Sequence, residues 1–565
     1  MVRPTTVGAL LLALVAILLP PESTAHALAD GGTVAIPMVV KGLWIFKLLL
    51  LAHAVLLAWA PALGPNGPDA RDSAGFDRRI TAGDLGLVGV CLTIALALRL
   101  HALGNGLWYD EIQTLVSYIR LPLSRIITTF DSQNQHPVYS ISARLAVSLF
   151  GESPWALRLP AALFGVASIG ALYWFARQVT NRTEAILATA LFTVSYHHLW
   201  FSQNARGYTA LLLWVLLGSA TFYRMMTGQS RRGWGPVILY AASMALATYT
   251  HITAVFVVIA HAAIWAGARW LAPGTSQIDA SGDRAKLDWR PALSVLLAGT
   301  FSLQLYALVL PQFPATFLDR AAAGPVTQAW KSPAWLVAEA ARGLSRGIPG
   351  GWLSIAVAVG CIAMGMLAYW RRSRIALATM LLPIVISGAA IFALNHNLWP
   401  RFFFFAAGFV VLIVMAGGFA LCELALGARG RTLAVTGASI VIAASAYTVP
   451  AAWHPKQDYE GAARFIEQRR AAADAVVTVD LTDYPYAAYL GKQWTSVNND
   501  DSLARVEQTH PRTWVLYTFP LRLAAVQPEL WARLRSRYDT AAVFPGTVGD
   551  GAIMVMVTRP PLPPT

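Results

Sequence analysis

The sequence has little charge for its length. Asp, Glu, Lys and Arg make up only 13% of the 565 residues, whereas hydrophobic residues make up 56%. A soluble protein of this size carries about twice that share of charged residues, so the composition excludes this class. Many windows instead contain about 20 apolar residues, enough to cross a hydrocarbon core of roughly 30 Å. We therefore predict a polytopic α-helical membrane protein.

Cysteine is also scarce, and the motifs of several protein classes are missing. The three cysteines, Cys91, Cys361 and Cys422, all lie in apolar stretches, which indicates neither a disulfide framework nor a thiolate metal site. The formal net charge is +14. Its arginines occur in short loops without an RNA- or DNA-binding motif, so nucleic acid is not expected as a partner. No internal repeat is found, which argues against a transporter built from inverted repeats.

The apolar residues gather in thirteen stretches that we predict as membrane spans, two N-terminal and eleven in the core. A polar segment follows the second stretch, so accessory spans at 1–82 are expected to be separate from a transmembrane domain at 83–452, and the less apolar tail is expected to form an α/β domain at 453–565. The first stretch also resembles a cleavable signal peptide, which is the alternative to a span. The stretches are Val7–Leu19, Ile36–Leu63, Gly83–Leu103, Trp155–Phe175, Thr183–Phe201, Tyr208–Met226, Gly235–Thr250, Ala254–Leu271, Pro291–Pro311, Trp352–Trp370, Ile375–Leu394, Phe402–Leu424 and Thr432–Pro450.

The loop charges predict which ends of the spans face the cytoplasm. If sides alternate along the chain, every short arginine-rich loop falls on one side, as cytoplasmic loops do. The residues that define this side are Arg71, Arg78, Arg79, Arg177, Arg182, Arg224, Arg231, Arg232, the loop from Arg269 to Arg290, Arg371, Arg372, Arg374, Arg429 and Arg431. The extracytoplasmic side receives the loop 104–153, the junctions 202–206 and 395–401, the turn at His251, the segment 312–351 and the tail from 451. The expected location is a bacterial plasma membrane.

The first extracytoplasmic loop and the tail both carry regular patterns. Apolar residues at helical spacing predict interfacial helices in the loop, at 111–120, 124–130 and 139–150. The tail alternates helical and β-rich segments, which is typical of a small α/β domain. Its helices are expected at 459–468 and 528–537, and its strands at 475–479, 513–517, 541–544 and 553–557.

Two adjacent carboxylates, Asp110 and Glu111, begin the first loop after an apolar span. Trp108 and Tyr109 precede them and form an aromatic belt of the kind found at a membrane interface. A carboxylate held at such a partly desolvated surface can serve as a general base. The alternative is ordinary solvation of a helix end, and the residues alone leave both readings open.

Further polar clusters occur at the same side of the membrane. In the first loop, Asp131, Gln135, His136 and Tyr139 could contact a metal, sugar hydroxyls or phosphate, although one His and one Asp are too few to assign a metal. The alternative is a solvated turn in which Pro137 starts a helix.

Two arginines at later span junctions suit an anionic ligand. Arg206, preceded by Gln203, and Arg401 each place a guanidinium at the interface, where it can bind phosphate with two hydrogen bonds. Snorkelling toward lipid headgroups is the alternative for these side chains. His251 lies at another junction of this side, and it could join His136 if the loops meet.

Four motifs in this order resemble a known family. They are Trp108-Tyr109-Asp110-Glu111, His136-Pro137-Val138-Tyr139, Arg158-Leu159-Pro160-Ala161-Ala162-Leu163-Phe164-Gly165 and Ser202-Gln203-Asn204-Ala205-Arg206-Gly207-Tyr208. The chain resembles the GT-C glycosyltransferases of family 39, the protein mannosyltransferase-like type that includes aminoarabinose transferases. The resemblance covers roughly 83–401.

The resemblance implies a function and a set of roles. It implies transfer of a mannose- or arabinose-like sugar, with inversion, from a polyprenyl-phosphate donor to a lipid, polysaccharide or protein acceptor. Asp110 would be the base, Glu111 its support, and Arg206 the donor phosphate ligand, with Arg401 and His136 as further candidates. The residues around the acids, Asp131, Gln135, Tyr139, Tyr109, Gln203 and His251, are candidates for sugar or acceptor binding.

The cofactor and the class of function keep alternatives. The family often shows a second proline where this chain has Val138, and some relatives have an acidic residue where it has Gln135, so these two departures argue against a divalent metal. No cofactor is therefore assigned, and a divalent metal at His136 and His251 is the alternative. No glycine-rich nucleotide cradle appears in the extracytoplasmic loops, which favours a lipid-linked donor. A flippase for lipid-linked saccharides and a non-catalytic envelope scaffold are the competing functions.

Overall fold

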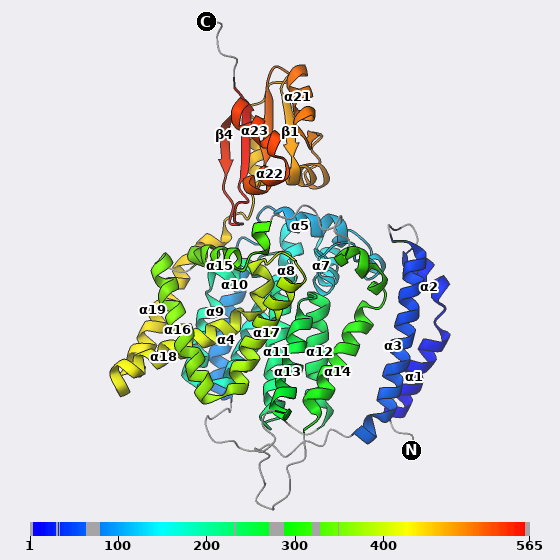
Figure 1. Ribbon diagram of the computed structural model, residues 1–565, viewed down its shortest axis with the longest axis vertical. Coiled ribbons are helices and arrows are strands. Elements are labelled where there is room, and N and C mark those ends of the chain that lie inside the picture. The colour runs from blue at the N-terminus through cyan, green and yellow to red at the C-terminus, as the bar shows by residue number, and fades with distance from the viewer. Residues whose placement is uncertain are drawn as a thin grey trace, which may run out of the picture.

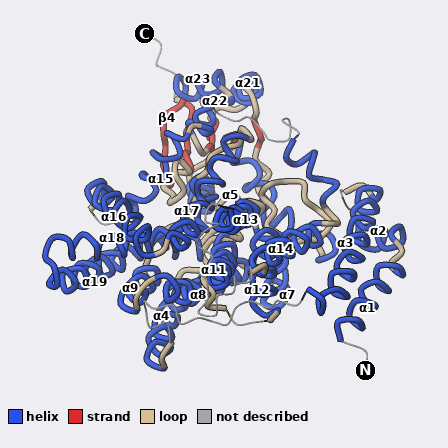
Figure 2. The backbone as a smooth tube through the Cα atoms, turned by 60° about the horizontal axis from the view of Figure 1, so that its bottom comes forward, coloured by secondary structure: helices blue, strands red, loops and turns tan. Residues whose placement is uncertain are grey.

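The computed structural model describes residues 4–29, 32, 34–63, 80–230, 233–270, 288–318, 328–347 and 350–559. A bundle of helices carries a small domain with a β-sheet at one end (Figure 1). Within the described ranges, the strands all lie in that small domain (Figure 2). Five of the arginines used for the topology lie outside the described residues, namely Arg71, Arg78, Arg79, Arg231 and Arg232.

The bundle consists of helices because a backbone in lipid must satisfy its hydrogen bonds internally. In both views α1, α2 and α3 lie at one side of the other helices (Figures 1 and 2). The helices are α1 Pro4–Leu18, α2 Pro21–Ala29, α3 Ile36–Leu63, α4 Ala82–Leu100, α8 Pro154–Val179, α9 Arg182–Thr193, α10 Tyr196–Ser202, α11 Tyr208–Met226, α12 Trp234–Thr250, α13 Ala254–Trp270, α14 Arg290–Tyr306, α15 Pro333–Gly347, α16 Gly351–Arg372, α17 Arg374–Ala393, α18 Ala407–Leu426 and α19 Gly430–Thr448.

Each of the thirteen expected spans corresponds to helix, with one correction. Among the described residues, seven helical segments are long and apolar enough to cross a membrane, or eight if the bent pair α1 and α2 is one span. The expected span Thr183–Phe201 is wrong as a continuous helix, because it breaks between α9 and α10. Ser195 caps the second piece by accepting a hydrogen bond from the His198 amide at 3.4 Å. Because of this break, α10 is a separate short helix that leads directly into the junction with Arg206.

The first loop folds over the end of the bundle as short helices. They are α5 Tyr109–Thr114, the π-helical turn η1 Leu115–Ile119, α6 Leu123–Ile126 and α7 Pro137–Phe150. The helix expected at 124–130 is shorter than predicted, because Pro122 fixes its start and the chain leaves helical geometry after Ile127. Pro137 occupies the first turn of α7, where its missing N–H costs nothing.

The tail is a five-stranded sheet with helices, as its alternating pattern predicts. The strand order is β2-β1-β3-β5-β4, with β1 parallel to both β2 and β3. Three elements of the tail, β2, α21 and α22, were not predicted from the sequence. The elements are α20 Tyr459–Glu467, β1 Ala475–Val479, β2 Thr495–Val497, α21 Asp500–Thr509, β3 Thr513–Tyr517, α22 Pro520–Val526, α23 Pro528–Arg537, β4 Tyr538–Phe544 and β5 Ile553–Thr558.

The tail is attached to the bundle by polar contacts rather than by the covalent linker alone. Lys456 donates to the carbonyl of Gln203 at 2.6 Å, and Trp200 donates to the Thr547 hydroxyl at 2.8 Å. A single apolar cluster also joins residues of α5, α7 and α8 to residues of α20 and the sheet. The structure therefore confirms a polytopic helical membrane protein with a small C-terminal α/β domain, and it places that domain against the first loop.

Candidate active site

Asp110 and Glu111 are adjacent in the first turn of α5, but their surroundings differ sharply. The helix starts after Trp108, whose amide donates to the Glu111 carboxylate at 3.3 Å. This contact folds Glu111 back beneath the helix start, where it is fully buried. The Asp110 side chain points elsewhere and remains 14% exposed.

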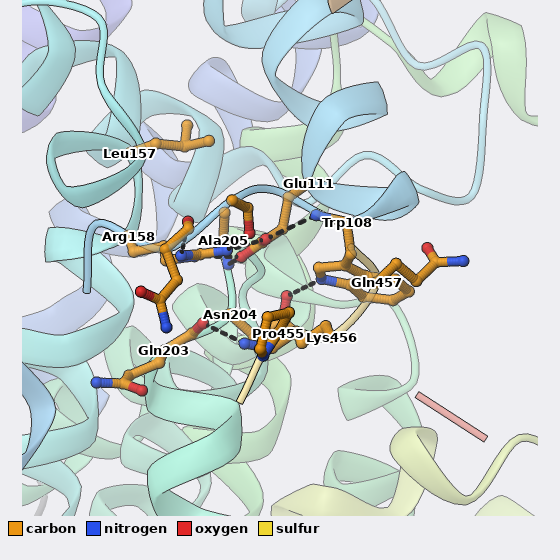
Figure 3. Close-up of polar contacts among 12 residues, drawn as sticks. Trp108, Glu111, Leu157, Arg158, Gln203, Asn204, Ala205, Pro455, Lys456 and Gln457 are labelled. Atoms are coloured by element: carbon orange, nitrogen blue, oxygen red, sulfur yellow. Dashed lines mark hydrogen bonds and ion pairs between the residues drawn. The ribbon is translucent and has the colours of Figure 1, made fainter. Parts of the chain in front are cut away.

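Glu111 is held in place by a dense set of hydrogen bonds (Figure 3). Arg158 of α8 donates to both of its oxygens, at 2.8 Å and 2.5 Å, and the Ala205 amide donates at 2.7 Å. Burial by itself would raise the pKa of Glu111, but the charge and hydrogen bonds of Arg158 outweigh this and lower it. Glu111 is therefore an ionised anchor that joins α5, α8 and the segment before α11.

Arg158 extends this anchor to the chain that leads into α5. Its guanidinium also donates to the carbonyls of Leu103, Asn105 and Gly106, at 3.1, 2.6 and 2.9 Å. A planar fork with five donors can satisfy a carboxylate and several carbonyls at once. The approach to Asp110 is thereby fixed from the protein interior.

Asp110 faces Arg401, the second residue of the 3₁₀ segment η5 (Pro400–Ala406) before α18. Their closest charged atoms, Oδ2 and Nη1, are 3.4 Å apart, an ion pair without a hydrogen bond. Oδ2 of Asp110 and Nε of Arg401 are both buried and have no hydrogen-bond partner among the described residues. Buried polar atoms normally have a hydrogen-bond partner, so each exception needs an explanation, such as a catalytic role or a bound ion.

Arg206 lies buried beside the same helix start. Its guanidinium donates to the Thr114 hydroxyl at 3.2 Å, to the Asn134 carbonyl at 2.9 Å and to the Asn134 side chain. Its Nη2 approaches Nε2 of His136 at 2.9 Å. Its Nε is buried and, within the described part of the chain, has no hydrogen-bond partner. Arg206 therefore keeps an unused donor in the interior of the site.

The His136 ring is held between two donors. The Gly207 amide donates to Nδ1 at 3.1 Å, while Arg206 lies 2.9 Å from Nε2. The pKa of His136 lies well below its usual value because of burial and the nearby charges of Arg206 and Arg401. A neutral ring that accepts at Nδ1 carries its hydrogen on Nε2. The Nε2 hydrogen then faces the guanidinium of Arg206, which is also a donor. An acceptor such as a phosphate oxygen would satisfy both donors.

His251, at the end of α12, completes this group of side chains. Its ring lies 4.9 Å from the His136 ring, edge to face, and its Nδ1 is 2.8 Å from the Thr253 hydroxyl. Burial, with the charges of Arg206 and Arg401, lowers its pKa to about 3, so it is neutral at ordinary pH. His136 and His251 are therefore neighbours, one of the possibilities that the sequence left open.

The metal alternative finds no fitting set of ligands. Among the described residues, no three His, Cys, Asp or Glu side chains gather closely enough to hold a metal ion. His136 and His251 are neighbours, but the guanidinium of Arg206 lies against His136. A second cation there would be repelled, so no step of the chemistry is assigned to a metal.

Four other candidates have their polar groups engaged in the fold. The buried Tyr139 hydroxyl donates to the Leu157 carbonyl at 2.5 Å, and the buried Gln135 accepts from Ser140 at 2.7 Å. Gln203 donates to the carbonyls of Arg99 and His101, at 2.9 and 2.5 Å. The exposed Asp131 accepts from Tyr118 at 2.8 Å. The structure thus surrounds three of them with protein groups and leaves Asp131 at the surface.

Tyr109 connects the site to the tail domain. Its amide donates to Gln457 at 3.0 Å, and its ring lies 6.3 Å from that of Tyr484. The pKa of its hydroxyl is raised to about 12, chiefly by burial, with the charges of Asp110, Arg522 and Asp480 acting on it as well. Tyr109 therefore lies between the acid of the first loop and an ion pair of the tail.

Three contributors were given no site role by the sequence analysis. Arg158 occurs near the start of an apolar span, and an ionisable residue there signals a partner, so Glu111 could have been inferred as its partner. Asn134 and Lys456 gave no such signal. Lys456 is buried over the Trp200 ring, 5.0 Å from its centre, and burial lowers its pKa to about 7.

Comparison with known proteins supports the resemblance. The family model described as dolichyl-phosphate-mannose-protein mannosyltransferase matches residues 134–275. Three of the four motifs noted in the sequence lie within this range. No curated protein matches the chain.

Several solved structures are similar at low identity. ArnT from Cupriavidus metallidurans, bound to undecaprenyl phosphate, has a TM-score of 0.48 at 14% identity, covering 84% of this chain and 98% of that chain. The oligosaccharyltransferase of Archaeoglobus fulgidus has a TM-score of 0.48 at 11% identity, covering 82% and 72%. The arabinosyltransferase EmbB from Mycobacterium smegmatis has a TM-score of 0.42 at 14% identity, covering 81% and 47%. The family match confirms the resemblance over residues 134–275, where the chain is similar to this glycosyltransferase family.

Proposed function

We propose that this enzyme transfers a sugar from a polyprenyl-phosphate donor to an acceptor hydroxyl, with inversion, at the extracytoplasmic face. The observation that carries the proposal is a set of buried polar atoms at one site that lack a hydrogen-bond partner among the described residues: Oδ2 of Asp110, Nε of Arg401 and Nε of Arg206. One of these is an acceptor suited to take a proton. The other two are cationic donors suited to a phosphate.

The proposed reaction is a single displacement. Oδ2 of Asp110 takes the proton of the acceptor hydroxyl as its oxygen attacks the anomeric carbon. The bond from that carbon to the phosphate oxygen breaks, and polyprenyl phosphate leaves with the electron pair. Arg206 and Arg401 stabilise the negative charge that develops on the phosphate, with His136 as a further donor.

The state of Glu111 supports inversion rather than retention. A retaining double displacement uses one carboxylate as the nucleophile and a second as the acid and base. Glu111 is the neighbouring carboxylate, but its two oxygens already accept hydrogen bonds from Arg158, Trp108 and Ala205. We therefore assign it a positioning role, in which it holds the start of α5 so that Asp110 faces the site.

Charges at the two ends of the bundle support the proposed sidedness. Arg182 pairs with Asp84 at 2.5 Å and Arg372 with Glu184 at 3.1 Å. These residues lie at the starts or ends of helices opposite the first loop. Basic residues concentrate on cytoplasmic ends, so the end with Asp110 and the tail is assigned to the extracytoplasmic side.

The test uses the purified chain in nanodiscs with radiolabelled mannosyl- and arabinosyl-phosphate polyprenols and an envelope extract as the acceptor source. Asp110→Asn should lower transfer about 10²- to 10⁴-fold, the usual contribution of a general base. Arg206→Ala should weaken donor binding. The control variants Glu152→Gln and Arg120→Ala remove an exposed ion pair of the same loop and should leave both quantities unchanged.

Two results would contradict the proposal. Full transfer by Asp110→Asn removes the base assignment. Movement of intact donor between leaflets, without transfer to any acceptor, would favour the flippase alternative instead.

A further inference from the structure

The carboxyl ends of β1 and β3 lie on the side of the tail domain that contacts the first loop. The two strands are parallel neighbours, so their carboxyl ends share one edge of the sheet. Gln457 links this edge to the site, because it donates to the Thr518 hydroxyl at 3.1 Å and accepts from the Tyr109 amide at 3.0 Å. In open α/β sheets, ligands bind in the crevice at the carboxyl ends of parallel strands.

Both strand ends adopt backbone conformations that side chains other than glycine rarely take. Asp480, the residue after β1, has a φ of 52°, and Phe519, which follows β3 and Thr518, has a φ of 50°. In the described chain only four non-glycine residues have positive φ, and these two lie at the same edge. Such strain persists where the surrounding structure fixes a functional geometry.

A charged pair occupies this edge. Arg522 of α22 donates to both oxygens of Asp480, at 2.9 and 3.2 Å. The two side chains keep 18% and 13% of their surface exposed, so each can still bind a further group. Tyr484 lies beside them in the chain segment after β1, with its hydroxyl 3.1 Å from Ser117 and its ring against Tyr109.

We propose that Asp480, Arg522, Tyr484 and Tyr109 form a saccharide-binding edge that holds a carbohydrate acceptor over Asp110. Neighbouring sugar hydroxyls donate to a carboxylate and accept from a guanidinium, which this pair offers side by side. Aromatic rings cover the apolar face of a sugar ring while their hydroxyls remain available for hydrogen bonds. A phosphate ligand would instead be repelled by Asp480.

The edge is close enough to the proposed base to present an acceptor to it. Tyr109 precedes Asp110 in the same helical turn, and the charges of Asp110, Asp480 and Arg522 all act on its hydroxyl. A sugar bound at the edge therefore extends over Tyr109 toward Asp110. Its role as acceptor rests on the proposed function, whereas saccharide binding at this edge does not.

The experiment measures saccharide binding to the full chain in nanodiscs by saturation-transfer NMR. The probes are the methyl glycosides of mannose, glucose, galactose and arabinose, with a Ser/Thr-rich peptide for comparison. At least one glycoside should show saturation transfer, and Arg522→Gln or Tyr484→Ala should lower its signal at least fivefold. The matched control is Asp500→Asn with Arg533→Gln, a similarly exposed ion pair elsewhere in the tail.

The outcomes separate this inference from the proposed function. Asp110→Asn should lose sugar transfer and keep glycoside binding, so failure of one proposal leaves the other measurable. Variants are compared only when their melting temperatures match that of the native chain, and Arg522→Lys replaces Arg522→Gln where they do not. Absence of binding by every glycoside overturns the inference. An equal loss in the control pair, or binding of the peptide alone, overturns it as well.

Discussion

The buried pair of Glu111 and Arg158 allows a quantitative test of what holds the site together. Its side chains are 0% and 4% exposed, and two hydrogen bonds join them. Removing one partner of such a pair leaves an uncompensated buried charge, which costs about 3–5 kcal/mol. Arg158→Met and Glu111→Gln should each lower the free energy of unfolding by an amount in this range.

The double variant should cost less than the two single variants together, because it buries no unpaired charge. We expect a coupling energy of about 2–3 kcal/mol, within the range of contacting residues. The measurement is unfolding by SDS in mixed micelles, followed by circular dichroism. The control cycle uses Arg120 and Glu152, an exposed pair at 2.8 Å that should couple by less than about 1 kcal/mol. Equal coupling in the two cycles, or additive losses at the buried pair, would refute the reasoning.

The remaining predictions concern the donor site and the tail contact. In Gly207→Ala the new Cβ would lie 2.8 Å from Nδ1 of His136 and 2.6 Å from a Thr250 methyl. Donor affinity, measured in a filter assay, should therefore fall about tenfold. The control Gly170→Ala should bind donor normally, because its Cβ would meet nothing within 4 Å. Lys456 has a pKa of about 7 in the folded chain and 10.5 when unfolded, so its burial penalty is complete below pH 7 and is relieved as the pH rises. The free energy of unfolding of the native chain, relative to that of Lys456→Met, should therefore rise by about 2–3 kcal/mol between pH 7 and 9, at roughly 1.4 kcal/mol per pH unit. If this difference between the two chains does not change with pH, Lys456 is not a buried titrating group.

The positions of helices and strands followed from local patterns. Apolar stretches fixed where the helices lie, because a backbone in lipid has few other solutions. The β-branched run Ala475–Val479 marked a strand for the same local reason. The break in the helix at Thr183–Phe201 could not be predicted from the sequence. Ser195 inside an apolar run can continue a helix or cap a new one, and the packing of distant segments decides between the two.

The sequence by itself placed Asp110 and Glu111 together at one membrane face, with Arg206 and Arg401 on the same side. The resemblance implied different roles for the two acids, and the tertiary structure supplies the physical difference, since Arg158 lies 47 residues away from Glu111 and pairs with it. It also decides that Gln135, Tyr139 and Gln203 satisfy protein groups, and that the tail lies over Tyr109. Hydropathy and propensity act over a few residues, whereas pairing, burial and unpaired atoms depend on which distant segments pack together.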